Sequence, residues 1–427
     1  MMKIRTLLIA WLLMLPLAAQ AELTIKITGG NVDAITIAIA PFEWEGGGTP
    51  PTAEFDRIIS DDLQRSGEFK PSSRSDQPPA APFGQPVNHA TWRDRGINNL
   101  VTGKVTSVAG RYRVEFVLHD TAGGKQITKD TVYAATKDQR FAAHHVADLV
   151  YEALTGERGA FATRIAFVVA NRRANSLQVS DSDGHGAKTI LATNDPIMSP
   201  SWSPNGKKLA YVSFEGGQPA IYVQNVESGS RRKLTSYKGI NGAPAWSPDG
   251  SRLAMTLSKD GDPEIYVMSA GGGGVQRITR SPGIDTEPSW SPDGNSLVFT
   301  SDRGGSPQIY RVSAAGGAPT RLTFEGKYNS NASFAPDGKS ITLVTRTSGG
   351  YQVALLDLET RGMQILSDGP LDESSSIAPN GKMVIYASGL RGTLHVAATD
   401  YDVETRLAAQ SGDVRNPAWS PFLIKRR

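Results

Sequence analysis

The chain of 427 residues contains no cysteine, which excludes a disulfide framework, thiol catalysis and cysteine-based zinc sites. Six histidines leave few other ligands for a transition metal, so we expect no metal site. The formal net charge is only +3, and it falls to +1 if Lys3 and Arg5 leave with a cleaved leader. Such a small charge gives no electrostatic case for nucleic-acid binding.

Long apolar runs are missing beyond the N-terminus, so we expect no later segment to cross a membrane. Residues 1–21 have the pattern of a secretory signal peptide: Lys3 and Arg5, the apolar run 7–15, then the small-residue cleavage pattern Ala19-Gln20-Ala21. That apolar run is too short for the alternative, an N-terminal membrane anchor. We therefore predict cleavage after Ala21 and secretion.

The chain also lacks the motifs of common catalytic sites. It has no Gly-x-Ser-x-Gly nucleophile elbow, and the glycine run 271–274 is not followed by the Lys-Ser/Thr of a phosphate-binding loop. Residues 181–186 begin like a calcium loop, but Ala192 stands where a bidentate glutamate is required. The adjacent His144 and His145 would point in different directions from a helix. We predict no enzymatic activity, no catalytic residue, no metal and no cofactor.

The sequence does contain a repeated motif of the type Trp-Ser-Pro-Asp-Gly, which we call the repeated phrase. Its copies, complete or weakened, begin at Trp202, Trp246, Trp290, Phe334, Ile377 and Trp419, at intervals of 44, 44, 44, 43 and 42 residues. Each interval holds about four short β-branched or aromatic runs separated by turn residues, which is typical of WD40-like propeller blades. The tryptophans are expected to pack on inner strands, and Asp249, Asp293 and Asp337 to form turns.

The two ends of the repeat array predict a closed ring. Residues 164–169, 177–179 and 188–191 resemble the second, third and fourth strands of a blade without its opening strand. Residues 417–421 are that opening strand with almost nothing after it. We therefore predict that residues 160–427 form a six-bladed β-propeller of four-stranded blades, closed by the C-terminal strand, which removes exposed sheet edges.

Residues 22–159 lack the repeat and have a sequence pattern typical of a small α/β domain with a mixed sheet and two helices. Together with the propeller, this makes the predicted fold of the whole chain mainly β. One predicted helix covers residues 52–67, with Thr52 as its cap, and the other covers residues 138–154. Strands are predicted at residues 23–27, 35–39, 100–105 and 112–117.

Binding residues are expected where the repeats differ, in the segments just before each aromatic phrase. If the aromatic strand is innermost, these segments surround one mouth of the central channel, and they offer the polar groups that grip a protein or peptide. The alternative is that they are solvated loops. The candidate residues are Met198, Ser199, Asn241, Gly242, Ala243, Asp285, Thr286, Glu287, Asn329, Ser330, Asn331, Leu371, Asp372, Glu373, Arg415 and Asn416.

Several of these segments, together with N-terminal ones, resemble the TolB family over nearly the whole mature chain. The N-terminal matches are Ile37-Ala38-Ile39-Ala40-Pro41-Phe42, Ile58-Ile59-Ser60-Asp61-Asp62-Leu63, Ser66-Gly67-Glu68-Phe69 and Leu100-Val101-Thr102-Gly103-Lys104-Val105. The propeller matches are Asn241-Gly242-Ala243-Pro244, Thr286-Glu287-Pro288, Phe299-Thr300-Ser301-Asp302, Leu371-Asp372-Glu373 and Ala378-Pro379-Asn380-Gly381.

The resemblance implies a periplasmic, non-enzymatic component of the Tol-Pal system, which maintains outer-membrane integrity and supports envelope constriction in cell division. It implies that the channel-mouth candidates bind the lipoprotein Pal, a contact that some colicins imitate, and that other outer-membrane proteins are further partners. It also implies that the mature N-terminus binds TolA, through Glu22, Leu23, Thr24, Ile25, Lys26, Ile27 and Asp33. Gly29-Gly30 is a candidate hinge that lets this segment alternate between docked and free states.

Two other functions remain open from the sequence. A small ligand or carbohydrate could bind in the channel of a periplasmic propeller. An enzyme could use a carboxylate pair from Asp285, Glu287, Asp372 and Glu373, although glycoside hydrolysis requires a fixed spacing between two of them.

Overall fold

The computed structural model describes residues 24–27, 34–171, 174–408 and 412–425. The predicted signal peptide, the Gly29-Gly30 hinge, Glu22, Leu23 and Asp33 lie outside these ranges. Within them, no helix combines the length and the apolar character that a membrane span requires.

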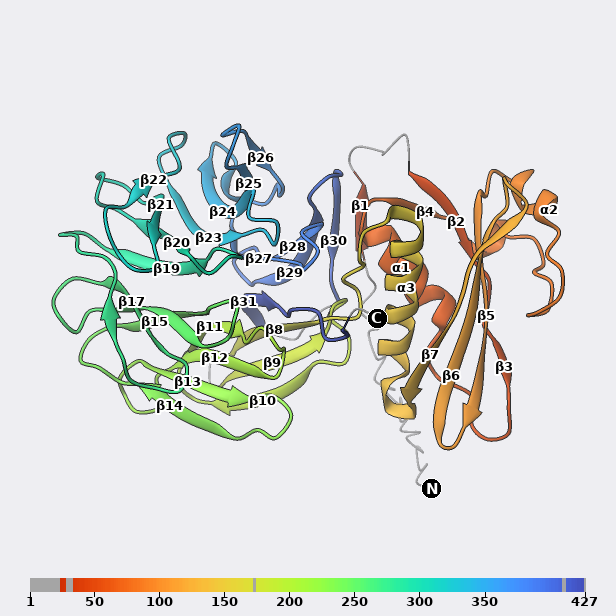
Figure 1. The fold of residues 1–427 in the computed structure, drawn as a ribbon, viewed down its shortest axis with the longest axis horizontal. Coiled ribbons are helices and arrows are strands. Elements are labelled where there is room, and N and C mark those ends of the chain that lie inside the picture. Colours follow the sequence, from red (N-terminus) through yellow and green to blue (C-terminus); the bar gives the residue numbers. More distant parts are fainter. Residues whose placement is uncertain (1–23, 28–33, 172–173, 409–411, 426–427) are drawn as a thin grey trace, which may run out of the picture.

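The C-terminal part is a propeller of six antiparallel sheets around one axis (Figure 1). Each innermost strand ends at the repeated aromatic or aliphatic residue, and the inner strands contact one another in a closed ring. Blade 1 comprises β31 (Asp413–Trp419), β8 (Arg164–Asn171), β9 (Ala174–Asp181) and β10 (Lys188–Thr193). Blade 2 comprises β11 (Ile197–Trp202), β12 (Lys208–Ser213), β13 (Ala220–Asn225) and β14 (Arg231–Thr235).

The other four blades follow in chain order. Blade 3 comprises β15 (Asn241–Trp246), β16 (Arg252–Leu257), β17 (Glu264–Ser269) and β18 (Gln276–Arg277). Blade 4 comprises β19 (Asp285–Trp290), β20 (Ser296–Ser301), β21 (Gln308–Ser313) and β22 (Thr320–Arg321). Blade 5 comprises β23 (Asn329–Phe334), β24 (Ser340–Thr347), β25 (Gly350–Asp357) and β26 (Met363–Ile365). Blade 6 comprises β27 (Asp372–Ile377), β28 (Met383–Ser388), β29 (Thr393–Ala398) and β30 (Val403–Arg406).

The predicted circular closure is confirmed. The C-terminal strand β31 pairs antiparallel with β8, so that Val414 faces Val169 and Trp419 faces Ile165. Trp419 is buried, and its indole N–H donates to the Thr163 hydroxyl at 2.8 Å. Closure therefore fastens residues that are more than 250 positions apart in the chain.

The repeated phrase ends in a turn, which explains its composition. In blade 3 the Asp249 carboxylate accepts from the Ser247 hydroxyl at 2.6 Å and from the Ser251 amide at 3.0 Å, and Gly250 takes a φ of 72°. These bonds fix the turn that leads into the next strand. The interpretation of Asp249, Asp293 and Asp337 as turn formers is confirmed, because each accepts a local backbone N–H.

The N-terminal domain is a mixed sheet with helices on both faces. Its strand order is β4-β2-β5-β6-β7, with β3 paired to β5, and β2 is parallel to both β4 and β5. The strands are β2 (Ile35–Ile39), β3 (Glu43–Glu45), β4 (Phe69–Pro71), β5 (Asn99–Val108), β6 (Arg111–Asp120) and β7 (Lys125–Ala135). The helices are α1 (Phe55–Arg65), α2 (His89–Arg93) and α3 (Gln139–Thr155), with 3-10 turns at Arg74–Asp76 and Thr136–Asp138. The helices α1 and α3 cover one face, whereas Trp92 of α2 packs on the opposite face against Ala38 and Leu100.

Three details of this part differ from the expectation. The structure adds the short helix α2 to the two predicted ones. Thr52 does not cap α1, whose N-cap is Glu54 without a side-chain bond; instead Thr52 exchanges hydrogen bonds with the Gln139 side chain at the start of α3. The strand β1 (Thr24–Ile27) does not join the N-terminal sheet but pairs with β30, as a fifth strand of blade 6.

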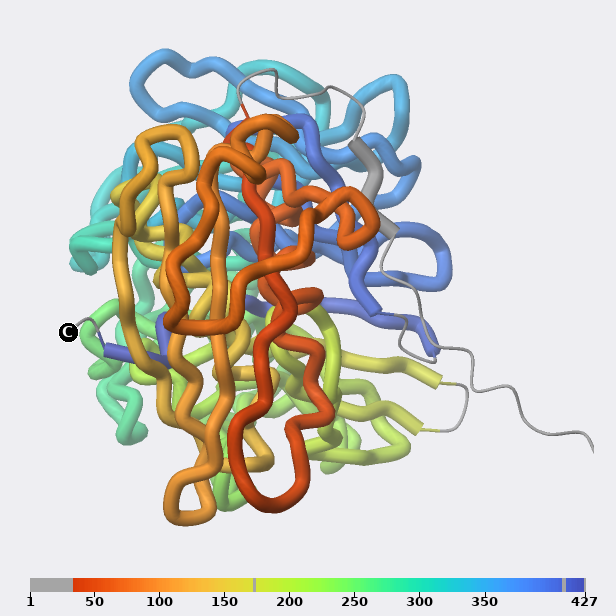
Figure 2. Tube along the Cα trace, turned by 90° about the vertical axis from the view of Figure 1, so that its right-hand side faces the viewer, coloured from red at the N-terminus to blue at the C-terminus, as the bar shows by residue number. Residues whose placement is uncertain are grey.

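The helices α1 and α3 lie between the N-terminal sheet and the propeller, on the side of blades 1 and 6 (Figure 1). Figure 2 shows the opposite, outer side of that sheet, with the long strands β5, β6 and β7 in front of the propeller. One continuous apolar core includes Ile59 of α1, Val146 of α3, Phe167 of blade 1 and Ile385 of blade 6. The two parts of the chain thus share one apolar core.

Candidate protein-binding channel

Every inner strand carries a β-bulge at the same place. Two of its residues stand opposite one residue of the second strand, as between Met198 and Ser201 of β11. The opposing residue is large and fully buried in each blade: Phe167, Tyr211, Met255, Phe299, Leu343 and Tyr386. The second bulge residue is proline in four blades, which suits a position where the ladder is interrupted and no N–H is needed.

The first bulge residue of each blade has a positive φ although none is glycine. We call these six residues the bulge ring: Ser199 (51°), Ala243 (44°), Glu287 (55°), Asn331 (53°), Ser374 (58°) and Asn416 (48°). A left-handed backbone at a non-glycine residue is strained, and such strain is concentrated at functional sites. The same backbone conformation recurs in all six blades. This repetition indicates that the bulges serve to direct these six residues toward the propeller axis.

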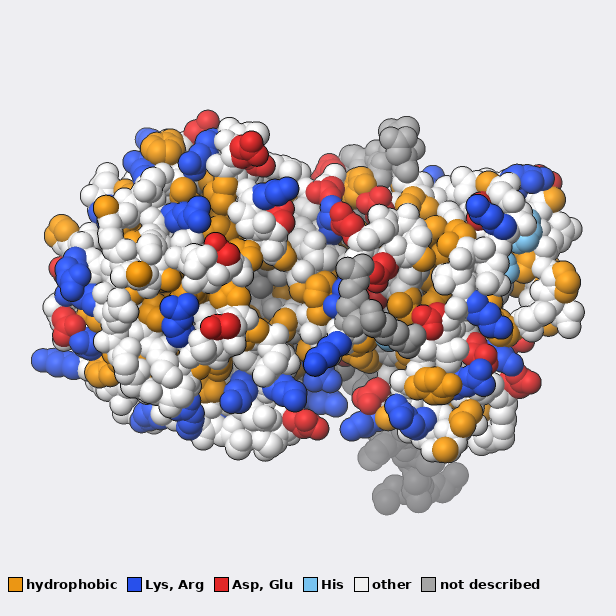
Figure 3. All heavy atoms as spheres, in the orientation of Figure 1, with side chains coloured by type: hydrophobic (Ala, Val, Ile, Leu, Met, Phe, Trp, Pro, Cys, Tyr) orange, Lys and Arg blue, Asp and Glu red, His pale blue; other side chains and the backbone are white. Residues whose placement is uncertain are grey.

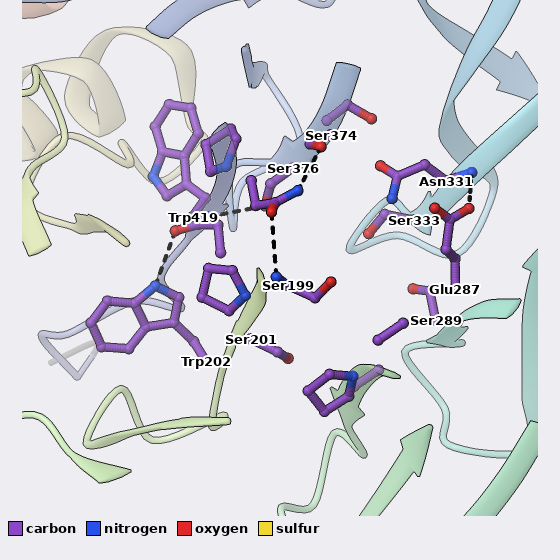
Figure 4. Close-up of a pocket in the computed structure, with 18 of the residues that line it drawn as sticks. Ser199, Ser201, Trp202, Glu287, Ser289, Asn331, Ser333, Ser374, Ser376 and Trp419 are labelled. Carbon is purple, nitrogen blue, oxygen red and sulfur yellow. Dashed lines mark hydrogen bonds between the residues drawn. The ribbon is translucent and has the colours of Figure 1, made fainter. Parts of the chain in front are cut away.

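The bulge ring lines a central cavity of about 460 Å³. Figure 4 shows Glu287 and Asn331 across this cavity from Ser199, Trp202 and Trp419. A deeper layer is formed by Ser201, Ala245, Ser289, Ser333, Ser376 and Ala418. The lining thus combines hydroxyl and amide groups with alanine, proline, methionine and tryptophan side chains. Among the residues that the structure describes, Glu287 is the one charged residue that lines the cavity.

Hydrogen bonds between neighbouring blades hold the ring in shape. The Glu287 carboxylate accepts hydrogen bonds from the backbone N–H of Asn331 at 2.9 Å and from the Thr300 hydroxyl at 2.8 Å. The Asn416 side chain donates to the Ser374 hydroxyl at 2.9 Å. Because these groups are fixed before any ligand arrives, little ordering is required on binding.

The predicted mouth residues fall into three places. Met198, Ser199, Ala243, Glu287, Asn331 and Asn416 line the cavity. Gly242, Thr286, Ser330, Glu373 and Arg415 immediately precede bulge residues, and Leu371 precedes β27. Asn241, Asp285, Asn329 and Asp372 are buried, and their side chains fasten the loops that enter the inner strands.

Asp285 illustrates why this last group is buried. Its carboxylate pairs with the Arg303 guanidinium at 2.5 Å, and Arg303 also donates to the Ser301 hydroxyl at 2.8 Å. Burial raises the pKa of Asp285, against hydrogen bonds from Ser301 and Arg303 that lower it. The residue stabilises the loop rather than offering a free carboxylate to a ligand.

Sequence reasoning missed Ser374, the bulge residue of blade 6. The candidate segment there ended one residue earlier, at Glu373, because the local phrase is weakened. The repeat period was a sufficient signal, since 43 residues separate Asn331 from Ser374 just as they separate Phe334 from Ile377.

Apolar side chains are exposed in the segments that lead into the inner strands. Ile240, Ile284 and Phe324 have exposed fractions of 45%, 50% and 69%, and Met198 of β11 is also exposed. These segments connect the outer strand of one blade to the inner strand of the next, so they lie at the mouth end of the channel. On the face of the molecule shown in Figure 3, basic and acidic side chains are interspersed, in keeping with the small net charge.

Away from the channel, the described residues include one group of histidine and aspartate side chains whose spacing alone would suit a metal ion. The ligand atoms of His144, Asp181 and Asp183 lie within 4.8 Å of one another. Arg140 forms ion pairs with both carboxylates, so a guanidinium already occupies the place a cation would take. The 181–186 segment is a tight turn after β9, in which the Gly184 amide donates to the Asp181 carbonyl at 2.9 Å.

A closed six-bladed propeller with a polar central channel, joined to a small mixed-sheet domain, defines the class of two-domain β-propeller proteins. Residues 151–423 match the family described as TolB beta propeller domain, and residues 23–127 match the TolB amino-terminal domain. The chain belongs to the TolB family.

Individual relatives agree with this assignment. The crystal structure of TolB from Acinetobacter baumannii has 42% sequence identity and a TM-score of 0.85, and covers 94% of this chain and 100% of that one. The Tol-Pal system protein TolB of Thioalkalivibrio sulfidiphilus is 48% identical over 243 residues, and that of Xanthomonas campestris 45% over 241 residues. These alignments cover 56% and 54% of each chain, so the match spans just over half the length of the curated relatives.

Proposed function

We propose that this protein is a periplasmic component of the Tol-Pal system that binds the lipoprotein Pal at the mouth of the propeller channel. In this role it maintains outer-membrane integrity and supports envelope constriction during cell division. Membership of the TolB family supports the proposal, since curated relatives are Tol-Pal system proteins.

The observation that carries the proposal is the bulge ring. Six blades adopt the same strained backbone to turn one residue each toward the axis, and hydrogen bonds between blades fix those residues in place. A rigid ring of amide, hydroxyl and carboxylate groups suits recognition of a folded partner, which gains affinity when neither surface must reorganise.

The exposed apolar residues favour a protein over a small molecule as the partner. Ile240, Ile284 and Phe324 stand around the polar cavity, and apolar anchors with neighbouring polar groups are typical of protein interfaces. A small ligand confined to the cavity would leave these side chains in water. Binding of Pal over the whole mouth would cover both features.

TolA is the second proposed partner, through the segment Glu22 to Asp33. The part of this segment that the structure describes, β1, pairs with β30 through backbone hydrogen bonds, with Thr24 opposite Arg406 and Ile27 opposite Val403. A four-residue edge strand makes few bonds and can be exchanged for another sheet edge. TolA would bind the segment after its release from blade 6.

A non-enzymatic role agrees with the cavity lining. Glycoside hydrolysis requires two carboxylates across the substrate. In the described part of the chain, Glu287 is the one carboxylate that lines the cavity, and Asp285 and Asp372 are buried.

Calorimetric titration of the mature protein with soluble Pal tests the proposal. We expect Glu287→Ala to weaken binding about ten-fold or more, or about 1.4 kcal/mol. Glu359→Ala is the matched control, because Glu359 is an exposed carboxylate in the β25–β26 turn, at the opposite end of the channel. Deletion of residues 22–33 is expected to abolish TolA binding. Failure of the unmodified protein to bind Pal would refute the assignment and redirect attention to small ligands in the cavity.

A further inference from the structure

Charged residues are buried where the N-terminal domain meets blade 1. We call Asp62, Arg65, Arg140, His144, Asp181 and Asp183 the interface cluster. Arg65 and His144 are completely buried and Asp62 almost so. Charged side chains are seldom buried unless they are paired, because leaving water carries a large free-energy penalty. The burial of these charges therefore implies that they are paired with one another, independently of the channel.

The contacts of the interface cluster run across the domain boundary. Within the N-terminal domain, the Asp62 carboxylate of α1 contacts His144 Nδ1 of α3 at 2.6 Å and accepts from Arg65 at 2.8 Å. On the propeller side, His144 Nε2 lies 3.8 Å from the Asp183 carboxylate, which also pairs with Arg140. Among the contacts of the described residues, His144 is the imidazole that stands between a carboxylate of each domain.

The charged groups around His144 carry a small excess of negative charge when all are ionised. The groups around His144 are Arg57, Asp61, Asp62 and Arg65 of α1, Arg140 and Asp148 of α3, Arg164 of β8, and Asp181 and Asp183 of β9 and its turn. When all are ionised, five carboxylates stand against four guanidiniums. Within this network His144 is the group that faces a carboxylate of each domain, Asp62 and Asp183, so an imidazolium there would offset the excess at the domain boundary.

The titration of the cluster agrees with its geometry. Burial alone would lower the pKa of His144, but the charges of Asp62 and Asp183 outweigh it and raise the pKa to about 9. Burial would likewise raise the pKa of Asp183, but His144 and Arg140 hold it at about 2. Both shifts favour the charged forms of His144 and Asp183 at neutral pH.

We propose that His144 is a protonated clamp between the two domains: its imidazolium binds Asp62 of α1 and attracts Asp183 of the propeller, and loss of its charge loosens their docking. His144 acts as a positioning residue, because it holds Asp62 of α1. Helix α1 in turn contacts β29 and β30 of blade 6, and β30 pairs with the N-terminal strand β1. The proposal depends on neither Pal nor TolA and can fail or succeed separately from the proposed function.

The direction of the pH dependence follows from the raised pKa of His144. Its contribution to stability is fully present below the unfolded value of about 6.5 and is lost as the pH rises through about 9. Asp61 and Asp148 titrate lower, because burial raises their pKa values to about 6 and about 7. A loss of docking between pH 8 and pH 10 is thus the signature of His144 rather than of these carboxylates.

A histidine-labelled sample of the full mature protein tests the charge directly by NMR. We expect the ring signal of His144, assigned by its absence in His144→Gln, to stay protonated at pH 8 and to titrate near 9. His185, which is exposed in the turn after β9, is the internal reference. Titration of His144 at or below about 6.5 would overturn the proposal, whatever the stability of the variant.

Urea unfolding of His144→Gln and of the control His185→Gln then separates charge from packing. At pH 7 we expect the folded-to-unfolded ratio of His144→Gln to be about ten-fold or more below that of the control. At pH 10 the gap should shrink to about three-fold or less, because the native imidazole is then neutral too. A gap of the same size at both pH values would mean that His144 only fills space, and would refute the clamp.

Hydrogen exchange reports the docking itself. The His185 amide donates to the Asp183 carboxylate at 2.9 Å, so it lies next to the contact that the clamp stabilises. In His144→Gln this amide should exchange faster at pH 7, whereas amides in β20, far from the boundary, should not change. Unchanged exchange at His185 would contradict the proposal.

Discussion

The channel and the domain interface bury polar groups in opposite ways. Around the channel, one bulge is repeated in six inner strands, and the polar groups there are small and neutral apart from Glu287. At the interface, each member of the interface cluster occurs once and depends on a partner from another element. A repeated arrangement distributes its free energy over many equivalent contacts, whereas a unique charge network fails when one member is removed. Single changes should therefore be costly at the interface and mild at the channel.

The largest effect is expected for Asp183→Asn. The change keeps the shape of the side chain but removes the negative charge that faces His144 and Arg140. The buried His144 then keeps only Asp62, and the partly exposed Arg140 keeps only Asp181. Because each group retains one carboxylate, we expect a cost of about 3 kcal/mol, at the lower end of the range for a broken buried ion pair. Equilibrium urea unfolding at pH 7 measures the difference from the unmodified protein.

Asp262→Asn is the control for this change, because Asp262 is an exposed propeller aspartate. Surface changes of this kind usually stay within about 0.5 kcal/mol. If Asp183→Asn also stayed within that range, the interface would not depend on its charges, and the contrast with the channel would be lost.

A smaller effect is expected at the seams between blades, for Trp202→Phe. The Trp202 indole N–H donates to the Ala418 carbonyl of the neighbouring blade at 3.0 Å. Phenylalanine leaves that carbonyl without its donor, at a cost of about 1–2 kcal/mol in the free energy of unfolding. Thermal and urea unfolding of the variant measure this cost.

Trp246→Phe provides the matched comparison. Trp246 occupies the same repeat position, but its indole nitrogen is buried without a hydrogen-bond partner. The same change of ring size should therefore destabilise blade 3 less than blade 2. Equal losses would show that ring volume, and not the bond between blades, determines the effect.

The two regions also differ in how much the sequence predicts. The blades, their turns and the closure by Trp419 follow from a local phrase whose turn chemistry acts within five residues. The interface cluster could not be predicted, because Asp62 meets His144 at a separation of 82 residues and Arg65 meets Ser182 at 117, without any motif. In the candidate site, the segments were found but their side-chain directions were not. Bulges with a positive φ at serine, alanine and glutamate have no sequence signal comparable to glycine.

A stabilising change is expected within the bulge ring, for Ala243→Gly. Ala243 has a φ of 44°, and glycine adopts that conformation without strain. The relief should exceed the entropy that glycine adds to the unfolded chain, for a net gain of up to about 1 kcal/mol. Ala245→Gly, two residues further along β15 and without a positive φ, should instead destabilise by about 0.5–1 kcal/mol. Losses of the same size in both variants would show that the ring is not strained.

The smallest effect is expected for Asp249→Asn in the turn of blade 3. Hydrogen bonds from Ser247 and Ser251 lower the pKa of Asp249 to about 2, but the bonds that shape the turn need only one acceptor oxygen. Asparagine supplies it: in blade 2, Asn205 accepts from the Ser203 hydroxyl at 2.8 Å and from the Lys207 amide at 3.0 Å. Urea unfolding at pH 7 should differ by less than about 0.5 kcal/mol, whereas Asp249→Ala, which removes the acceptor, should cost about 1 kcal/mol. A large loss in Asp249→Asn would mean that the charge itself matters in the repeat, and the distinction between a charge-dependent interface and a charge-independent propeller would no longer hold.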